Sequence, residues 1–318
     1  MNDVWGDRTT SRRTLLGLGL AGLLNWPLAG CDDGKSPSSH RSPSPVDSPD
    51  RPLVVTSVGT LQGLVARAKY TRAHLTSAEV RSYRLDDWIA LHRAQRNRLS
   101  LTGTTSSIGV LRSRTPWPTM RAQETSAAHG FAASALEAES GALAGLLAQL
   151  AAGIDMQLAA TAAAPGSLDV EPDIPDATPT IQVDAMQQTL ADEHAALYLY
   201  GVLGAHTSAS RTPTLFAAVD AAYAAHRARR DRLTALLEDA GKEPVASHPG
   251  YRIPAPLRTD QQIADEGLRL ERGTAARYLW LVENSTDDVR TLAVAALRNT
   301  AVRELSFRGS PEIFPGAF

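Results

Sequence analysis

The sequence predicts an all-α protein made of two tandem four-helix bundles. Alanine is abundant, aromatic residues make up only 5% of the chain, and runs of β-branched residues are scarce, a composition that favours helices. Apolar residues recur every three or four positions along most of the chain, which is the spacing of a helix with one buried face. Prolines cluster in two stretches, 32–52 and 161–182, which therefore predict linkers.

The first 31 residues have the three parts of an export signal. Arg12 and Arg13 precede an apolar stretch, 15–28, and small residues then lead to Cys31. The apolar stretch is shorter than the roughly 20 residues that a membrane-spanning helix needs. Residues 11–16, Ser-Arg-Arg-Thr-Leu-Leu, resemble a twin-arginine export motif, with a general secretory signal as the alternative.

The run Leu-Ala-Gly-Cys at 28–31 resembles the lipobox of bacterial lipoproteins. That resemblance implies that Cys31 is acylated and that membrane lipid holds the chain on the extracytoplasmic face of the cell membrane. Each buried acyl CH₂ group contributes about 0.8 kcal/mol, so two or three chains anchor a protein firmly. The alternative is an ordinary apolar helix in which Cys31, the sole cysteine, falls here by chance.

Bulk composition excludes some classes of protein. The formal net charge is −2, so there is no electrostatic case for nucleic acid as a partner. With one cysteine, no internal disulfide can form. The stretch 32–52 is rich in serine and proline and almost free of apolar residues, which predicts a disordered spacer between membrane and fold.

Helical periodicity divides the rest of the chain into two halves. The first, 53–160, predicts helices near 58–75, 83–101, 119–137 and 140–158 and forms a degenerate bundle. A proline-rich linker, 161–182, follows. The second half, 183–318, predicts helices at 183–206, 212–240, 260–284 and 286–308. Each half thus has the four helices of an antiparallel bundle.

A short signature recurs in the second helix of each half. The run His-Arg-Ala-Gln-Arg-Asn-Arg-Leu begins at His92, and His-Arg-Ala-Arg-Arg-Asp-Arg-Leu begins at His226. Six of the eight positions agree, which favours a duplicated unit over coincidence in a chain rich in arginine and alanine. His92 lies on an apolar face, which predicts a core histidine in a half that acts as a scaffold or docking surface.

Four ionisable side chains of the second half fall on the apolar face of their helices. They are one per helix: Glu193, His226, Glu271 and Glu304. An unpaired carboxylate is costly to bury, by several kcal/mol, so four such groups near one axis need partners or a cation.

This pattern resembles the ferritin-like di-metal carboxylate proteins, in which two helices each supply a Glu and two supply Glu-x-x-His. The resemblance implies single glutamates at Glu193 and Glu271, with His226 and Glu304 as remnants of the two paired motifs. Tyr223 stands where the first motif has Glu, and Phe307 where the second has His, so two of six ligands are missing. Residues 183–318 more specifically resemble an actinobacterial family of ferritin-like domains of unknown function.

Two interpretations of these four residues remain open. In one, Arg229 or Arg230 neutralises a glutamate and His226 bonds another, giving a structural network without metal. In the other, the four residues bind iron or manganese, completed by His194, Glu266 or water. The missing ligands favour a non-enzymatic binding or assembly module of the cell envelope, with an envelope protein as partner; the alternative is a metal-binding protein or oxidase. Pairing into a homodimer is a further expectation.

Overall fold

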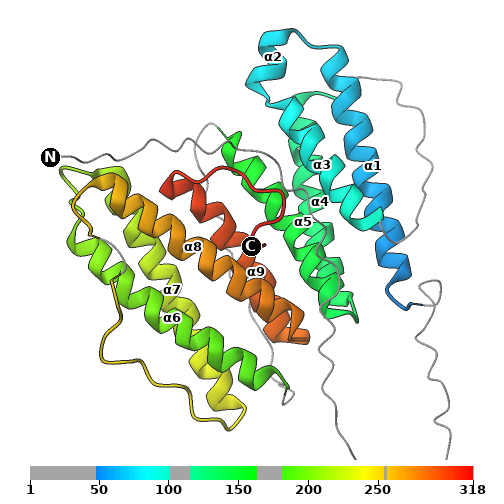
Figure 1. The fold of residues 1–318 in the computed structure, drawn as a ribbon. Coiled ribbons are helices and arrows are strands. Elements are labelled where there is room, and N and C mark those ends of the chain that lie inside the picture. The colour runs from blue at the N-terminus through cyan, green and yellow to red at the C-terminus, as the bar shows by residue number, and fades with distance from the viewer. Residues whose placement is uncertain (1–47, 101–114, 163–180, 254–255, 318) are drawn as a thin grey trace, which may run out of the picture. The chain divides into compact units, whose positions relative to one another are not determined.

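The computed structural model describes residues 48–100, 115–162, 181–253 and 256–317, and over these residues it contains helices and no strand. This confirms the all-α prediction. The helices in chain order are α1 (Arg51–Ala73), α2 (Ser77–Ser82), α3 (Leu85–Ser100), α4 (Trp117–Glu137), α5 (Gly141–Ala160), α6 (Ile181–Ala205), α7 (Pro213–Asp239), α8 (Asp260–Glu283) and α9 (Asp287–Glu304), followed by the 3₁₀ turn η2 (Leu305–Phe307) (Figure 1).

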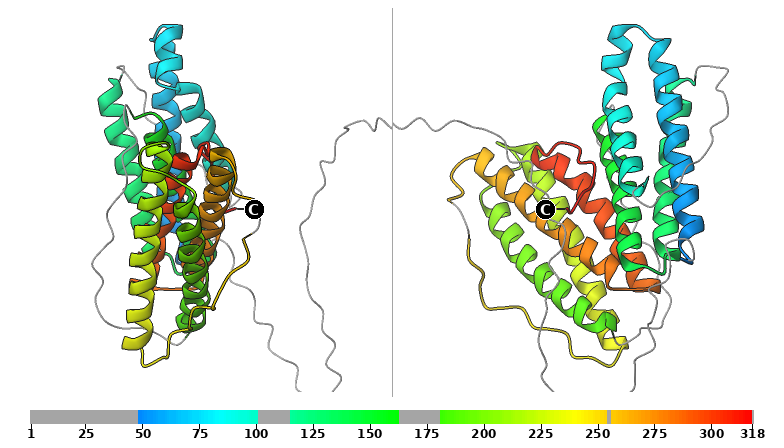
Figure 2. Two further views of the ribbon diagram at one scale, coloured as in Figure 1. Left: turned by 90° about the vertical axis from the view of Figure 1, so that its left-hand side faces the viewer. Right: turned by 45° about the vertical axis from the view of Figure 1, so that its right-hand side comes forward.

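Each half is a bundle of four long helices arranged as two hairpins. In the first half α1 packs along α3 and α4 along α5; in the second, α6 packs along α7 and α8 along α9. Figures 1 and 2 show the two groups of helices, with α5 and α9 as neighbours between them. The described residues of both halves belong to one compact unit, 43–318.

Helix α1 begins at Arg51, inside the stretch that the sequence predicts as spacer. Asp50 explains this difference, because its buried carboxylate accepts hydrogen bonds from the backbone N–H groups of Glu139 (2.8 Å) and Ser140 (2.9 Å). These groups lie at the start of α5 and would otherwise lack acceptors. The last residues of the predicted spacer are therefore part of the fold.

Helix α2 has no counterpart in the prediction. It has six residues and buries none of them, so it lacks the apolar periodicity that marks a longer helix. A capping box starts it: the Thr76 hydroxyl accepts from the Glu79 N–H, and the Glu79 carboxylate accepts from the Thr76 N–H. The same device, made by Thr259 and Gln262, starts α8.

Helix α5 joins the two halves. It packs against α4 on one side and against α8 and α9 on the other. Among the described residues it is the one helix long and apolar enough to cross a membrane, but 78% of that apolar window is buried inside the protein, as expected of a core helix. A Cβ on Gly141 would lie only 2.0 Å from the carbonyl oxygen of Glu283, so glycine allows the close approach of α5 to the end of α8.

Polar contacts also fasten the halves together. Arg298 on α9 contacts Asp155 on α5 at 2.6 Å, and Arg290 donates to the Ala138 carbonyl at the end of α4. The C-terminal tail adds a third contact, since Gln149 on α5 donates to the Pro315 carbonyl at 3.0 Å. The predicted division into two bundles therefore describes the helix grouping, while the halves share one buried surface.

A long crossover connects α7 to α8. After Gly241, which has a φ of +67°, the chain runs back along the outside of α6 (Figure 1). Gln187 holds it there with both amide atoms: its Nε2 donates to the Glu243 carbonyl, and its Oε1 accepts from the Val245 N–H, each at 2.7 Å. This strap lets α8 start at the end of the bundle opposite to the end of α7.

The export motif with Arg12 and Arg13, the lipidation site Cys31 and most of both predicted linkers lie outside the described residues. They remain predictions from the sequence.

Candidate functional site

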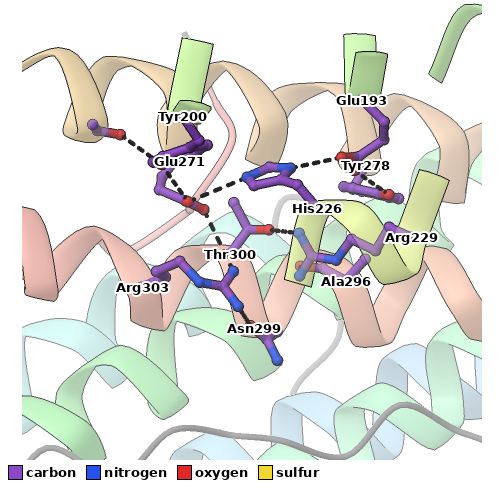
Figure 3. Close-up of polar contacts among 11 residues, drawn as sticks. Glu193, Tyr200, His226, Arg229, Glu271, Tyr278, Ala296, Asn299, Thr300 and Arg303 are labelled. Carbon is purple, nitrogen blue, oxygen red and sulfur yellow. Dashed lines mark hydrogen bonds and ion pairs between the residues drawn. The ribbon is translucent and has the colours of Figure 1, made fainter. Parts of the chain in front are cut away.

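The centre of the second bundle is the imidazole of His226 on α7. Its Nδ1 lies 2.6 Å from Glu193 Oε2 on α6, and its Nε2 lies 3.3 Å from Glu271 Oε1 on α8 (Figure 3). All three side chains are buried. The structure thus brings three of the four sequence-predicted residues into direct contact, with the histidine bridging two carboxylates.

Two tyrosines extend this bridge at both ends. The Tyr278 hydroxyl donates to Glu193 Oε1, and the Tyr200 hydroxyl donates to Glu271 Oε1, each at 2.6 Å. Tyr200 also stacks on the imidazole of His226 with ring centroids 5.1 Å apart. The result is a continuous buried chain of five side chains, Tyr–Glu–His–Glu–Tyr, across α6, α7 and α8 (Figure 3).

Helix geometry accounts for this arrangement. On α6 a glutamate and a tyrosine, 193 and 200, are seven residues apart, and the same spacing separates 271 and 278 on α8. Seven residues are about two turns, so each pair lies on one face of its helix. Because each tyrosine bonds the glutamate of the other helix, the two pairs meet in reciprocal, antiparallel register. The sequence analysis missed this pairing, although the repeated Glu-x₆-Tyr spacing was the available signal.

Arg229 is fully buried beside this chain. Its guanidinium donates to the Thr300 hydroxyl (2.8 Å) and the Ala296 carbonyl (3.3 Å) of α9, and it lies 5.2 Å from the centre of the Tyr278 ring. Arg230, the other arginine predicted for this network, instead pairs with its neighbour Asp231 near the surface. The α7 sequence therefore contributes one arginine to the core, three residues after His226.

A second arginine, Arg303 on α9, was not predicted. One of its terminal nitrogens lies 3.6 Å from Glu271 Oε2, and the other donates to Asn299 (Figure 3). Arg303 therefore places a positive charge on the side of Glu271 that faces away from His226.

Glu304, the fourth predicted residue, lies apart from His226. It is fully buried, and its Oε2 is 3.4 Å from Nε of Arg272, whose terminal Nη2 pairs with Glu312 at 2.8 Å. Its second oxygen, Oε1, has no hydrogen-bond partner among the described residues. Glu304 thus belongs to a neighbouring cluster at the C-terminal end of α9.

The pKa shifts describe a chain that is charged at its centre. Burial on its own would raise the pKa of Glu271, but the charges of Arg303 and His226 outweigh it and lower the pKa to about 2. Burial likewise opposes ionisation of Glu193, yet His226 and Arg229 hold its pKa below the usual value. Burial also disfavours charge on His226, while the two carboxylates raise its pKa. The favoured state is therefore an imidazolium between two carboxylates.

Glu304 behaves in the opposite way. Burial raises its pKa to about 8, and the nearby Glu312 adds to the shift, while Arg272 only partly offsets it. At neutral pH this carboxyl group is therefore mostly protonated. The second bundle holds ionised and neutral glutamates a short distance apart, with the difference set by which of them has arginine and histidine neighbours.

The arrangement of donors bears on the predicted metal site. Over the residues that the structure covers, no group of three or more His, Cys, Asp or Glu side chains is arranged so that it could hold a metal ion. The two nitrogens of His226 point to different carboxylates rather than to a common point. Glu266 pairs with Arg269 at 2.5 Å, and His194 contacts the Val245 carbonyl of the strap, so neither completes the set. As described, these side chains do not fit around one ion.

Comparison with known proteins covers this bundle. Residues 185–318 match a family described as Domain of unknown function (DUF4439). Among solved structures, a conserved hypothetical protein, rv2844, from Mycobacterium tuberculosis is 28% identical, with 42% of this chain and 98% of that chain covered and a TM-score of 0.38. No curated protein matches the chain. The matched residues begin within two positions of the predicted start of the second bundle and contain the whole His226 chain.

The first half, outside the DUF4439 match, holds a smaller cluster around the other histidine of the repeat. His92 Nε2 lies 2.9 Å from Glu124 Oε2 on α4, and its Nδ1 faces the amide of Gln95 at 3.4 Å. Gln95 also donates to the Leu150 carbonyl of α5. His92 is fully buried, as predicted. Its pairing with Glu124 was missed, because the pattern along α3 and α4 does not show how the two helices pack and Glu124 has no spacing that singles it out.

Proposed function

We propose that this chain is a membrane-anchored extracytoplasmic lipoprotein whose second bundle is ferritin-like and serves as a non-enzymatic binding or assembly module of the cell envelope. The observation that carries the non-enzymatic part is the closure of the His226 chain. Both ring nitrogens face carboxylates, and three of the four oxygens of Glu193 and Glu271 accept hydrogen bonds. The fourth, Glu271 Oε2, has no hydrogen bond among the described residues but lies 3.6 Å from the guanidinium of Arg303. Buried polar groups that use their hydrogen-bonding capacity on one another in this way stabilise a core and are not free to bind a substrate.

Topology supports the ferritin-like assignment. Ferritin-like bundles have one long crossover between their two helix hairpins. Here the strap between α7 and α8 runs along α6, while the α6–α7 and α8–α9 connections are short. One inward ionisable residue per helix is the second feature in common, because Glu193, His226, Glu271 and Glu304 are all buried.

The anchor is proposed from the sequence, on the twin-arginine-like motif and the lipobox that ends at Cys31. Fractionation of cells that express the full chain tests it. We expect the protein in the membrane fraction and accessible to protease added outside spheroplasts. Cys31→Ala should move it to the soluble extracytoplasmic fraction, and Arg12→Lys with Arg13→Lys should keep it inside the cell. A soluble cytoplasmic protein in all three cases would contradict the proposal.

A metal-binding role stays as the second candidate, on one specific observation. Glu304 has a buried oxygen without a partner among the described residues, and it lies on the helix next to Glu271. Elemental analysis of the full chain from its own host tests this candidate. We expect less than a stoichiometric amount of iron, manganese or zinc. One metal ion per chain, lost in both Glu193→Ala and His226→Ala, would replace the structural interpretation with a metal site.

A further inference from the structure

The first bundle has an open groove between α1 and α4. It encloses about 460 Å³. The α1 wall consists mainly of glycine and hydroxyl residues, among them Thr56, Thr60 and Gly63, while the α4 wall combines Ser126, Gly130 and Ser134 with Gln123, Ala127 and Phe131. A cavity of this size is within the usual range for ligand sites, roughly 300–1,000 Å³. It is separate from the His226 chain, which lies in the other bundle.

The two walls are held at both ends in antiparallel register. Arg67 donates a hydrogen bond to the side chain of Gln123 at one end. At the other end Asp50, just before α1, accepts from the backbone of Ser140, just after α4. Between these fastenings the walls do not touch at the glycines: a Cβ on Gly63 or Gly130 would meet nothing within 4 Å. These glycines therefore face open space and are not explained by close helix packing.

One hydroxyl residue of the groove is buried. Ser57 lines the groove, its residue surface is only 2% exposed, and its side chain makes no hydrogen bond within the described part of the chain. A hydroxyl without a partner in the protein can donate to or accept from a ligand atom placed beside it. Among the described residues of the lining Arg67 is the only charged one, and Gln123 uses one of its five N–H donors.

In the second bundle, side-chain contacts join the two helices that correspond to the walls of this groove. The first and third helices of this bundle, α6 and α8, are tied by the reciprocal tyrosine–glutamate pairs and by Arg277, which contacts Asp192 at 2.6 Å. In the first bundle, the described residues of α1 and α4 meet at the Arg67–Gln123 hydrogen bond, and the groove is open beyond it.

We infer that this groove binds a short, extended, acidic peptide segment of a partner protein, with a carboxylate at the Arg67 end. Eleven residues of α1 separate Thr56 from Arg67, or about 16 Å of helix, which matches about five residues of extended chain. Hydroxyls can both donate to and accept from a peptide backbone, and a guanidinium bonds a carboxylate in a charge-assisted pair. This inference rests on the proposed role as a binding module and names its docking surface and the chemistry of its partner.

Fluorescence polarisation with the full chain in detergent tests it, using three pools of labelled pentapeptides that end in glutamate, glutamine amide or lysine amide. We expect the glutamate pool to bind about tenfold more tightly than the glutamine pool, as a charge-assisted hydrogen bond requires. Arg67→Gln should remove that preference. Gly63→Leu should block all pools, with Gly130→Leu on the opposite wall as the second blocking variant if the first does not fold.

Arg93→Gln is the matched control, because Arg93 is an exposed arginine of the same bundle that does not line the groove. It should leave the preference for glutamate unchanged. Equal binding of the three pools, or binding that survives both leucine variants, would overturn the inference. The proposed function is tested separately, by fractionation and by elemental analysis. If the chain fractionates with the membrane and holds no metal while the peptide pools bind equally, the groove is not the docking site, but the proposed anchor and binding module stand.

Discussion

The two halves carry the same eight-residue signature and use its histidine differently. His92 meets one carboxylate, Glu124, and is followed three residues later by Gln95. His226 meets two, Glu193 and Glu271, and Arg229 stands in the place of the glutamine. Each additional buried negative charge in the second half thus comes with a buried positive one. The difference teaches that the signature supplies a core histidine, while the neighbouring helices decide whether it becomes the centre of an ionic network.

The first helix of each half accounts for most of this contrast. The buried face of α6 contains Glu193, whereas the buried residues of α1 are apolar apart from Ser57 and Thr71. With a glutamate and a tyrosine on both α6 and α8, the second bundle ties its first and third helices together. In the first bundle, α1 carries no such glutamate–tyrosine pair, and the first and third long helices, α1 and α4, leave a groove between them.

The largest expected effect separates the two histidines. His226→Leu leaves two carboxylates without their shared cation, and breaking a buried ionic group in this way costs about 3–5 kcal/mol. His92→Leu leaves only one carboxylate without its partner, so we expect a smaller loss of about 1–3 kcal/mol. Urea unfolding of both variants at pH 7 measures the difference. Equal losses would show that the second network is no more ionic than the first.

The next effect concerns the neutral and ionised glutamates within the second bundle. The pKa of Glu304 is raised to about 8 by burial, so its contribution to stability is present below pH 4.5 and is lost as pH rises towards 8. Glu304→Gln keeps the neutral shape, and its stability relative to the parent should rise by about 4 kcal/mol between pH 4.5 and 8. Unfolding free energies measured across this range test the expectation, and a constant difference between the two proteins would contradict it.

Glu271→Gln is the matched control with the opposite sign. The pKa of Glu271 is lowered to about 2, so the stability it provides is present above pH 4.5 and is lost as pH falls from 4.5 to 2. The parent should therefore lose its advantage over this variant in acid, whereas it loses its advantage over Glu304→Gln in base.

Removal of one phenol hydroxyl should cost less. Tyr278→Phe and Tyr200→Phe each delete a 2.6 Å hydrogen bond to a buried carboxylate, and we expect about 1.5–2 kcal/mol for each. Because the two pairs are reciprocal, the double variant should also loosen α6 from α8, which hydrogen exchange of the α6 amides would detect. Tyr223→Phe, an exposed tyrosine on α7, is the control and should change the unfolding free energy very little.

The smallest effect compares the two capping boxes. Thr259→Ala removes the cap of α8, a helix with a long buried face, and should cost about 1 kcal/mol. Thr76→Ala removes the cap of α2, which buries none of its residues, and should cost less in global stability. Thermal unfolding of the two variants checks the order, and a larger loss for Thr76→Ala would contradict it.

Much of the fold follows from local pattern. Apolar spacing and helix-stop residues located the eight long helices, and the same periodicity placed Glu193, His226, Glu271 and Glu304 in the interior. The start of α1 was wrong by seven residues, because Asp50 gains its role only when it meets the beginning of α5. Periodicity likewise could not show that Arg303 faces Glu271 or that Glu124 faces His92, since those pairings depend on how separate helices pack.

The spatial arrangement of the site could be predicted less well than the residues that belong to it. Four inward groups on four helices suggested one centre, but the side chains form a bridge at His226 and a separate cluster at Glu304. Spacing on one helix fixes the face on which a residue lies. Its height relative to residues on other helices depends on the loops and on the register of packing, which the long strap between α7 and α8 helps to set.

Thermal unfolding of the full chain with and without added Mn²⁺ or Fe²⁺ most directly tests whether the His226 chain satisfies itself. Metal at a hundred times its dissociation constant would stabilise the fold by about 2.7 kcal/mol. We predict that neither ion changes the melting temperature of the chelator-treated parent protein or of Glu193→Gln. A rise in the melting temperature of the parent that is absent from Glu193→Gln and His226→Leu would show that these residues bind metal and would contradict the structural account.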